Sequence, residues 1–314
     1  MTDRTWTGNV NNSARNPGNW DPTGAPQPGD NLLLPSGSTI NVTDDDLHGD
    51  PLVVSGAISF PPPPTTINLS HHAHVLLEKS DFSAAATVIV NVKGTDTLDA
   101  VTGTIGNDPG GAPSLTVSLA DNARLLGSFN MRFGALTISD GDHARYVNNG
   151  TDSLRGTHAV IGTDVTGSGT FQVSAVQVSR TGAIPGFLEF GESVSKGQTV
   201  DLTGLRVVDE FGNVFPTTST IQLDEPKEFR GTVDLHDLSI ADLVGLARAD
   251  SWNYENDMLS IFNGCGRLID KLNVISDAPS TGDIHGLSVS KSLAGDVLVN
   301  PGTDFHGSLA SPTS

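Results

Sequence analysis

Residues 136–147, LTISDGDHARYV, repeat a phrase that begins 21 residues earlier in the chain. Residues 115–126 read LTVSLADNARLL, and the Leu, Thr, Ser, Asp, Ala and Arg of the two stretches stand at matching positions. Self-similarity with a period near 20 residues is typical of a solenoid, in which each repeat forms one coil that stacks on the next. The two stretches therefore predict neighbouring coils of a repetitive β fold.

We expect each coil to be one rung of a parallel β-helix, because 21 residues suffice for about three short strands with their turns. Equivalent residues then stack about 4.8 Å apart along the axis. A β-sandwich is the alternative, but it gives no reason for side-chain identity to recur at this spacing. The pairs expected to stack are Leu115 with Leu136, Val117 with Ile138, Asp121 with Asp142, and Arg124 with Arg145.

Composition supports an all-β fold, and we expect a solenoid of roughly ten to twelve coils. The 314 residues include 35 Gly and 18 Pro, and short runs of Val, Ile and Leu are bounded by turn-forming residues. One segment, 237–249, predicts a short helix that Ser239 caps. The apolar residues that share one face of this predicted helix are Ile240, Leu243, Val244 and Ala247.

Three parts are expected along the chain. Residues 1–35 form an N-terminal cap and the first coil, and residues 36–223 form the β-solenoid. Residues 224–314 form a β-rich module that contains the short helix.

The charge balance limits the partners of the chain. The formal net charge is −19, and no cluster of Lys and Arg offers a surface for phosphates, so we expect no nucleic-acid partner. The single cysteine, Cys265, allows neither an intrachain disulfide nor a cysteine-based zinc site. No run of apolar residues approaches the 18 that a membrane-spanning helix needs, so we expect no membrane insertion.

The segment TDDDLHGD, at 43–50, is the candidate metal site. It gathers Asp44, Asp45, Asp46 and Asp50, and calcium binds six to eight oxygen ligands of the kind that clustered carboxylates supply. The spacing matches neither an EF-hand nor a calcium-binding β-roll. Calcium is thus one interpretation of this segment, and an exposed acidic turn is the other.

Trp6 and Trp20 are the candidate ligand or capping residues near the N-terminus. Their rings are able to stack on sugars. Alternatively, they cover the first coil, which would otherwise expose apolar side chains and strand edges that lack a partner.

No catalytic residue is predicted. The chain lacks the Gly-x-Ser-x-Gly, Ser-x-x-Lys and His-Glu-x-x-His motifs. Asp121 and Asp142 repeat from coil to coil, whereas a catalytic acid and base need different environments to hold different pKa values. We therefore expect a non-enzymatic protein.

The opening stretch, 6–30, resembles the start of repetitive bacterial surface proteins and autotransporter-type passenger proteins. Stretch 134–173 is similar to their coils, and stretch 229–274 to a module near the C-terminus of large exported proteins of alphaproteobacteria. The resemblance implies a right-handed β-helix at the cell surface that serves adhesion, a biofilm or a coat, and here no C-terminal membrane barrel is expected. The matching residues of the opening are Trp6, Gly8, Asn19, Trp20, Pro26, Gly29 and Asp30.

Together these features predict an extracellular structural protein that assembles with itself. An uncapped stack of coils leaves strand edges at its ends, and such an edge pairs with another copy, end to end, into a filament. Adhesion, with a surface polysaccharide as partner, is part of the same prediction. The alternatives are a β-helix lyase or hydrolase that acts on polysaccharides, and a carbohydrate-binding adhesin module.

Overall fold

Strands make up nearly all of the regular structure in the computed structural model, and the fold is all-β, as predicted. Contacts between residues divide the chain into unit 1, Met1–Ser153, and unit 2, Leu154–Ser314. The division into three parts that the sequence predicts, with boundaries after residues 35 and 223, stays a prediction. No helix of the described residues is long and apolar enough to cross a membrane. The structure describes residues 2–27, 31–34, 38–43, 52–54, 65–70, 74–78, 87–93, 97–105, 113–141, 143–276, 286–302 and 306–309.

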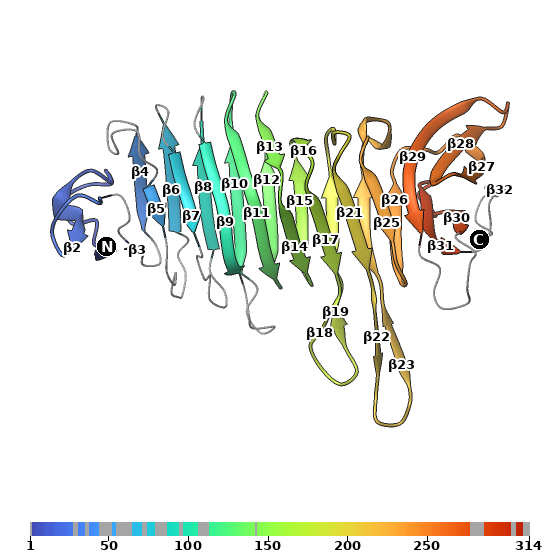
Figure 1. The fold of residues 1–314 in the computed structure, drawn as a ribbon, viewed down its shortest axis with the longest axis horizontal. Helices are drawn as coiled ribbons and strands as arrows, with labels where there is room; N and C mark the ends of the chain where they lie inside the picture. Colours follow the sequence, from blue (N-terminus) through green and yellow to red (C-terminus); the bar gives the residue numbers. More distant parts are fainter. Residues whose placement is uncertain are drawn as a thin grey trace. The chain divides into compact units, whose positions relative to one another are not determined.

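Unit 1 contains a small sheet of order β2-β1-β3 and two series of parallel strands (Figure 1). Ladder 1 has the order β4-β6-β8-β10-β12, and ladder 2 has the order β5-β7-β9-β11-β13. A 3-10 turn, η1, covers Pro17–Asn19. The strands are β1 Asp3–Trp6, β2 Trp20–Asp21, β3 Asn31–Leu33, β4 Thr39–Thr43, β5 Leu52–Val54, β6 Thr65–Ser70, β7 His74–Glu78, β8 Thr87–Val92, β9 Thr97–Ile105, β10 Ser114–Leu119, β11 Arg124–Arg132, β12 Ala135–Ser139 and β13 Arg145–Asn148, and β14 Thr151–Arg155 crosses the unit boundary.

The repeated phrase pairs as predicted. Strand β10 lies parallel to β12, with Leu115 opposite Leu136 and Val117 opposite Ile138, and all four side chains are buried. Strand β11 likewise places Arg124 opposite Arg145 of β13. Asp142 lies outside the described residues, so the expected pair of Asp121 and Asp142 stays a prediction.

The repeat varies in strand number and in length. The repeat that begins with β10 gives only two strands, β10 and β11, whereas the next repeat gives the three short strands that were expected, β12, β13 and β14. Side chains in register are 27 residues apart from Asn41 to Asn68, 23 from Asn68 to Asn91, and 21 from Ser118 to Ser139. The connections between strands differ in length, so most of the repeats are not recognisable in the sequence.

Unit 2 contains ladder 3, of order β15-β20-β24-β26, and ladder 4, of order β17-β21-β25-β29, both parallel. Antiparallel strands then follow, β31 and β30 after β26, and β28, β27 and β32 after β29. The 3-10 turn η2 covers Pro226–Glu228. The strands are β15 His158–Gly162, β16 Asp164–Gly167, β17 Thr170–Ser174, β18 Val176–Gln177, β19 Ala183–Ile184, β20 Phe187–Phe190, β21 Thr199–Thr203, β22 Leu205–Val208, β23 Val214–Thr217, β24 Ser219–Leu223, β25 Thr232–Leu235, β26 Ser239–Leu243, β27 Ala249–Glu255, β28 Met258–Asn263, β29 Leu268–Ser276, β30 Gly286–Lys291, β31 Val297–Gly302 and β32 His306–Ser308.

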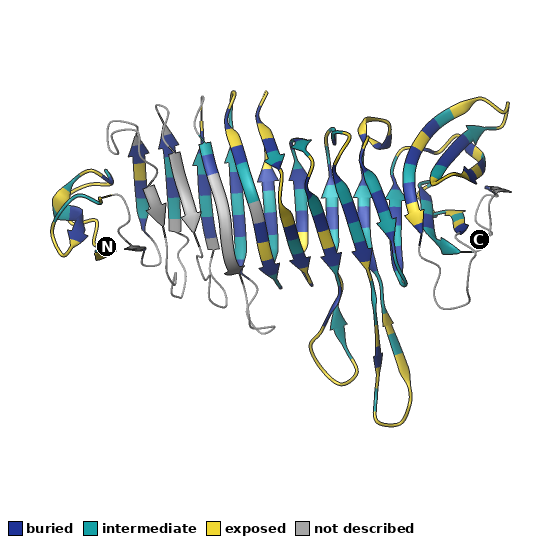
Figure 2. Ribbon diagram, viewed as in Figure 1, coloured by how far each residue is buried: buried dark blue, intermediate teal, exposed yellow. Residues whose placement is uncertain are grey.

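The helix predicted at 237–249 is wrong, because this segment holds strand β26. Ser239, Ala241 and Leu243 are buried, and the residues between them are half-buried, which is the period of a strand. Strand β24 offers a ladder edge to these residues, and tertiary pairing overrides a local preference for helix. Figure 2 shows a similar alternation of buried and more exposed positions along many of the strands that it colours by burial.

Unit 1 also buries one carboxyl group. Asp152, on β14, is fully buried and accepts hydrogen bonds of 2.6 Å from the Tyr146 hydroxyl and from the Phe129 backbone N–H. Burial raises the pKa of Asp152 to about 7, although both hydrogen bonds act in the opposite direction. Burial also raises the pKa of Tyr146 well above its usual range, so the phenol remains a donor.

Because Asp152 is buried with a raised pKa, we expect the free energy of unfolding to decrease as pH rises from about 4 to about 7. In the folded chain Asp152 keeps its proton up to about pH 7, whereas the unfolded chain releases it near the ordinary value of 3.8. The folded state therefore binds more protons within this window, and the free energy of unfolding decreases with pH.

Urea unfolding at several pH values, compared between the native chain and Asp152→Asn, measures this contribution. We expect the difference in unfolding free energy between the two chains to change across the window and to level off above it. A difference that does not vary with pH would contradict the assignment.

Candidate functional site

Trp6 and Trp20 pack against each other in unit 1, at the pair formed by β1 and β2. Their rings meet edge to face, with centroids 4.9 Å apart, and both side chains are buried. The indole N–H of Trp20 donates a 2.8 Å hydrogen bond to the Ala14 carbonyl. A sugar ring would have to displace one ring to stack on the other, so this geometry favours the capping interpretation of the two residues.

The segment beside these rings reaches the first strand of ladder 1. Ala14 N–H donates to the Asn41 carbonyl, and Asn41 N–H donates to the Asn12 carbonyl. Residues 12–14 therefore occupy backbone groups of β4 that would otherwise face outward as a strand edge.

The predicted calcium ligands Asp44, Asp45, Asp46 and Asp50 lie outside the described residues, and calcium binding there stays a prediction. Within the part of the chain that the structure describes, no three His, Cys, Asp or Glu side chains gather in a way that would hold a metal ion.

Two hairpins that were not predicted from the sequence project from unit 2. Strands β18 and β19 form one, and β22 and β23 form the other, each a separate antiparallel pair (Figure 1). We call the second hairpin, residues 204–219, the arm. Its sequence signal is present in VVDEFGNVFP, at 207–216, where a turn with Asp, Gly and Asn separates two apolar runs.

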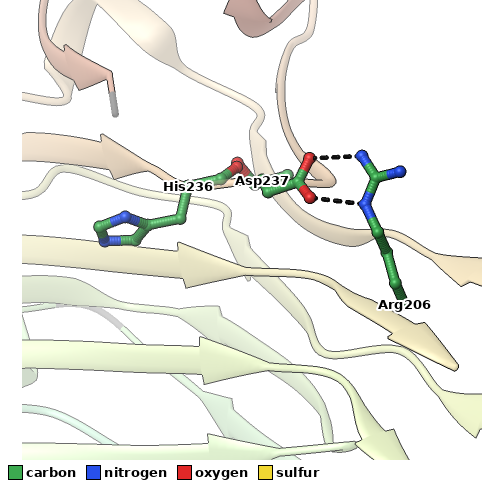
Figure 3. A network of polar contacts seen from close by, with 4 residues as sticks. Arg206, His236 and Asp237 are labelled. Atoms are coloured by element: carbon green, nitrogen blue, oxygen red, sulfur yellow. Dashed lines mark hydrogen bonds and ion pairs between the residues drawn. The ribbon is translucent and has the colours of Figure 1, made fainter. Parts of the chain in front are cut away.

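The base of the arm is fastened to the turn that precedes β26. Gly204 N–H donates to the Asp237 carbonyl at 2.9 Å, and Ser219 N–H donates to the Leu238 carbonyl at 3.1 Å. The Arg206 guanidinium donates to both carboxylate oxygens of Asp237, at 2.7 and 3.0 Å (Figure 3). Position 204 requires glycine, because a Cβ there would lie 2.2 Å from the Leu238 carbonyl oxygen.

The loop at the end of the arm is held by one carboxylate. Asp209 accepts hydrogen bonds from the backbone N–H groups of Phe211 and Asn213 and from the side-chain amide of Asn213. The bond from that amide is the main reason why the pKa of Asp209 lies below its usual value. Gly212 has a φ of +82°, which suits glycine. These hydrogen bonds stabilise the loop in the conformation that the structure shows.

The same loop exposes apolar side chains. Phe211 is 82% exposed, and Val208 and Val214, which pair across the arm, are 59% and 51% exposed. We call these three residues the arm tip. Beside it, Arg180 of the β18–β19 hairpin lies 3.3 Å from Glu210, so an ion pair joins the two hairpins.

His236 lies between two carboxylates next to the turn that holds the arm. Its Nε2 is 3.2 Å from Asp201 Oδ1 and 3.7 Å from Asp234 Oδ1, and all three side chains are partly exposed. Asp201 and Asp234 are direct partners on β21 and β25. Carboxylates stacked in register see similar surroundings, which suits a structural cluster better than an acid and base pair.

A cavity of about 240 Å³ opens near the end of β26 in unit 2. Three of its four charged lining residues are acidic, which disfavours an anionic ligand. Burial, together with the nearby charges of Asp296 and Asp224, raises the pKa of the adjacent Asp242. The residues that line the cavity are Asp224, Glu225, Pro226, Lys227, Glu228, Val244, Gly245 and Leu246.

Comparison of the chain with models of protein families gives no match, and neither does comparison with curated proteins or with solved structures. The geometry of the chain is therefore the basis for its functional interpretation, and the arm is its most distinctive feature.

The anchoring of the arm predicts the effect of Asp237→Ala. Removal of this carboxylate breaks both side-chain hydrogen bonds from Arg206, so we expect faster hydrogen exchange at the backbone amides of residues 205–217, with little change in β20 and β21. Arg180→Ala is the control, because it removes only the exposed ion pair between the hairpins. Equal exchange of the arm in the native chain and in Asp237→Ala would refute the role of this contact.

Proposed function

We propose that the chain is a right-handed parallel β-solenoid that serves as a structural and adhesive protein of the bacterial surface. Support comes from the in-register parallel pairing within each unit and from the regular alternation of strands between two ladders. A repetitive scaffold of this kind is stabilised by contacts between neighbouring repeats. Function then depends on the features that depart from the repeat.

The arm is the observation that carries the adhesive role. Its base is fastened to the following turn, its loop is held by Asp209, and its tip exposes Phe211 with two valines. Exposed apolar groups that gather at one place mark an interaction site more often than scattered ones do. A loop that is already ordered loses little conformational entropy on binding.

Assembly through strand edges is less well supported than contact through the arm. In unit 2 both parallel ladders continue into antiparallel strands, and in unit 1 residues 12–14 bond to β4. These segments occupy positions that another copy would need for end-to-end pairing. We therefore place adhesion, and any association of copies with one another, at the arm tip.

The surface location and a structural role for calcium belong to the same proposal. The net charge of −19 attracts cations such as calcium. The resemblance of stretches 6–30, 134–173 and 229–274 to exported surface proteins supports a place outside the cell.

A polysaccharide hydrolase or lyase is the second candidate, and the cluster of His236, Asp201 and Asp234 is the observation in its favour. The cavity of unit 2 has other lining residues, and none of these three is among them. A carbohydrate-binding module without catalysis requires only the arm tip. The release of sugar fragments from glycans distinguishes the enzyme from both binding functions.

If the arm tip is the binding site, the substitution Phe211→Ser abolishes binding of the chain to its partner surface. The labelled native chain is applied to an array that carries bacterial surface polysaccharides and the immobilised chain itself, with and without calcium. We expect retention on at least one of these surfaces and its loss in Phe211→Ser, because the substitution removes the most exposed apolar side chain of the tip.

Leu293→Ser is the matched control, since Leu293 is 89% exposed in a different turn. This variant keeps the native retention if the arm tip is the binding site. Failure of the native chain to bind any surface, or equal binding by Phe211→Ser, would contradict the proposal.

A further inference from the structure

Ladder 1 of unit 1 presents a row of four threonines and one isoleucine on its outward face. Strands β4, β6, β8, β10 and β12 pair residue for residue, and the alternate side chains point away from the buried ones. One outward residue of each strand is half-buried and lies directly beside that of the next strand. These residues, in order along the ladder, are Thr39, Thr66, Ile89, Thr116 and Thr137.

A second row of amides and hydroxyls runs beside the first. The Asn68 amide donates to the Asn41 side-chain oxygen at 2.9 Å, and the Asn91 amide donates to that of Asn68 at 2.7 Å. The Ser139 hydroxyl lies 3.4 Å from that of Ser118. Side chains held by one another, beside β-branched threonines with restricted χ1 angles, form an ordered surface. The second row, in order, is Asn41, Asn68, Asn91, Ser118 and Ser139.

We call these two rows the ladder face, and none of their ten side chains is ionisable. The outward face of ladder 2 differs, because Thr97, Arg124 and Arg145 stand in register there. The whole chain carries a net charge of −19, so an uncharged face stands out from the rest of the surface. An uncharged face of hydroxyls and amides suits a neutral partner that forms hydrogen bonds.

The size and composition of the ladder face narrow the choice of partner. Five strands about 4.8 Å apart, with about 7 Å between the two rows, give a patch of only a few hundred Å². A stable protein partner buries about 800 Å² on each side, so a second copy is poorly matched. The face has no aromatic ring, so it offers no platform on which a sugar ring could stack.

We propose that the ladder face binds ice. Ice is an uncharged lattice of hydrogen-bonding oxygens, and its surface rows repeat at distances comparable to the two repeats of this face, about 4.8 and 7 Å. The hydroxyls and amides hold water molecules at these repeats, and the methyl groups of threonine and Ile89 lie between them. Because the lattice is periodic, every strand of the face engages it in the same way, and the small contacts add together.

This inference goes beyond the proposed function and does not depend on it. It concerns the strands of unit 1, whereas the adhesive proposal concerns the arm tip of unit 2. Phe211→Ser therefore leaves ice binding unchanged, and failure of either proposal leaves the other standing.

The experiment follows the labelled, purified full chain as ice grows slowly from its solution, and also measures the gap between the melting and freezing temperatures. We expect the native chain to enter the ice and to open a gap, and Thr116→Lys, at the centre of the face, to lose both properties. Thr97→Lys is the matched control, because it places the same substitution on the outward face of ladder 2. Thermal unfolding verifies that both variants fold.

Ser139→Lys is the second variant, since this exposed side chain tolerates substitution without disturbing the core. Its exclusion from ice would support the proposal even if Thr116→Lys failed to fold. Exclusion of the native chain from ice would overturn the proposal, as would entry of both lysine variants at the native level. Binding to cellulose or chitin without any effect on ice would also overturn it and would assign the face to a neutral polysaccharide.

Discussion

Parallel backbone pairing in register, from each strand to the corresponding strand of the next repeat, is the constraint on which the rest of both units depends. It places each side chain beside the residue at the same position of the neighbouring repeat, as Leu115 lies beside Leu136. Apolar residues thus stack on apolar residues inside, and polar residues form rows outside. The ladder face, the Arg124–Arg145 pair and the stacked Asp201 and Asp234 all follow from this one arrangement.

The sequence predicted the stacking wherever two repeats have the same length and similar residues. The phrase at 115–126 and 136–147 meets both conditions, so its strand register was predicted residue by residue. Elsewhere the connections differ in length, and the equivalence of Asn41, Asn68 and Asn91 is not apparent before the strands are paired. Three short strands per repeat occur at β12, β13 and β14, whereas β11 continues as one strand beside both β13 and β14, because chain length alone does not say where a strand is interrupted.

The features with chemical interest were harder to predict, because they depend on contacts between distant residues. Segment 237–249 carries a helical spacing of apolar residues, but the edge of β24 decided its structure. The turn signal of the arm was present in 207–216, whereas its anchor, Asp237, lies 31 residues from Arg206. In the sequence, Asp152 looks like an ordinary surface residue. It is buried because its side chain points inward from β14.

The fastening of the arm has a mechanical consequence. The two strands of the arm leave at Gly204 and Ser219, and each is bonded there to the turn that joins β25 to β26. A pull on the arm tip is therefore shared between the strands from which the arm emerges and those of the following repeat. An arm attached in this way resists being pulled from the sheet, since a load must break its hydrogen bonds to the turn between β25 and β26 before it can separate β21 and β24 from their neighbours.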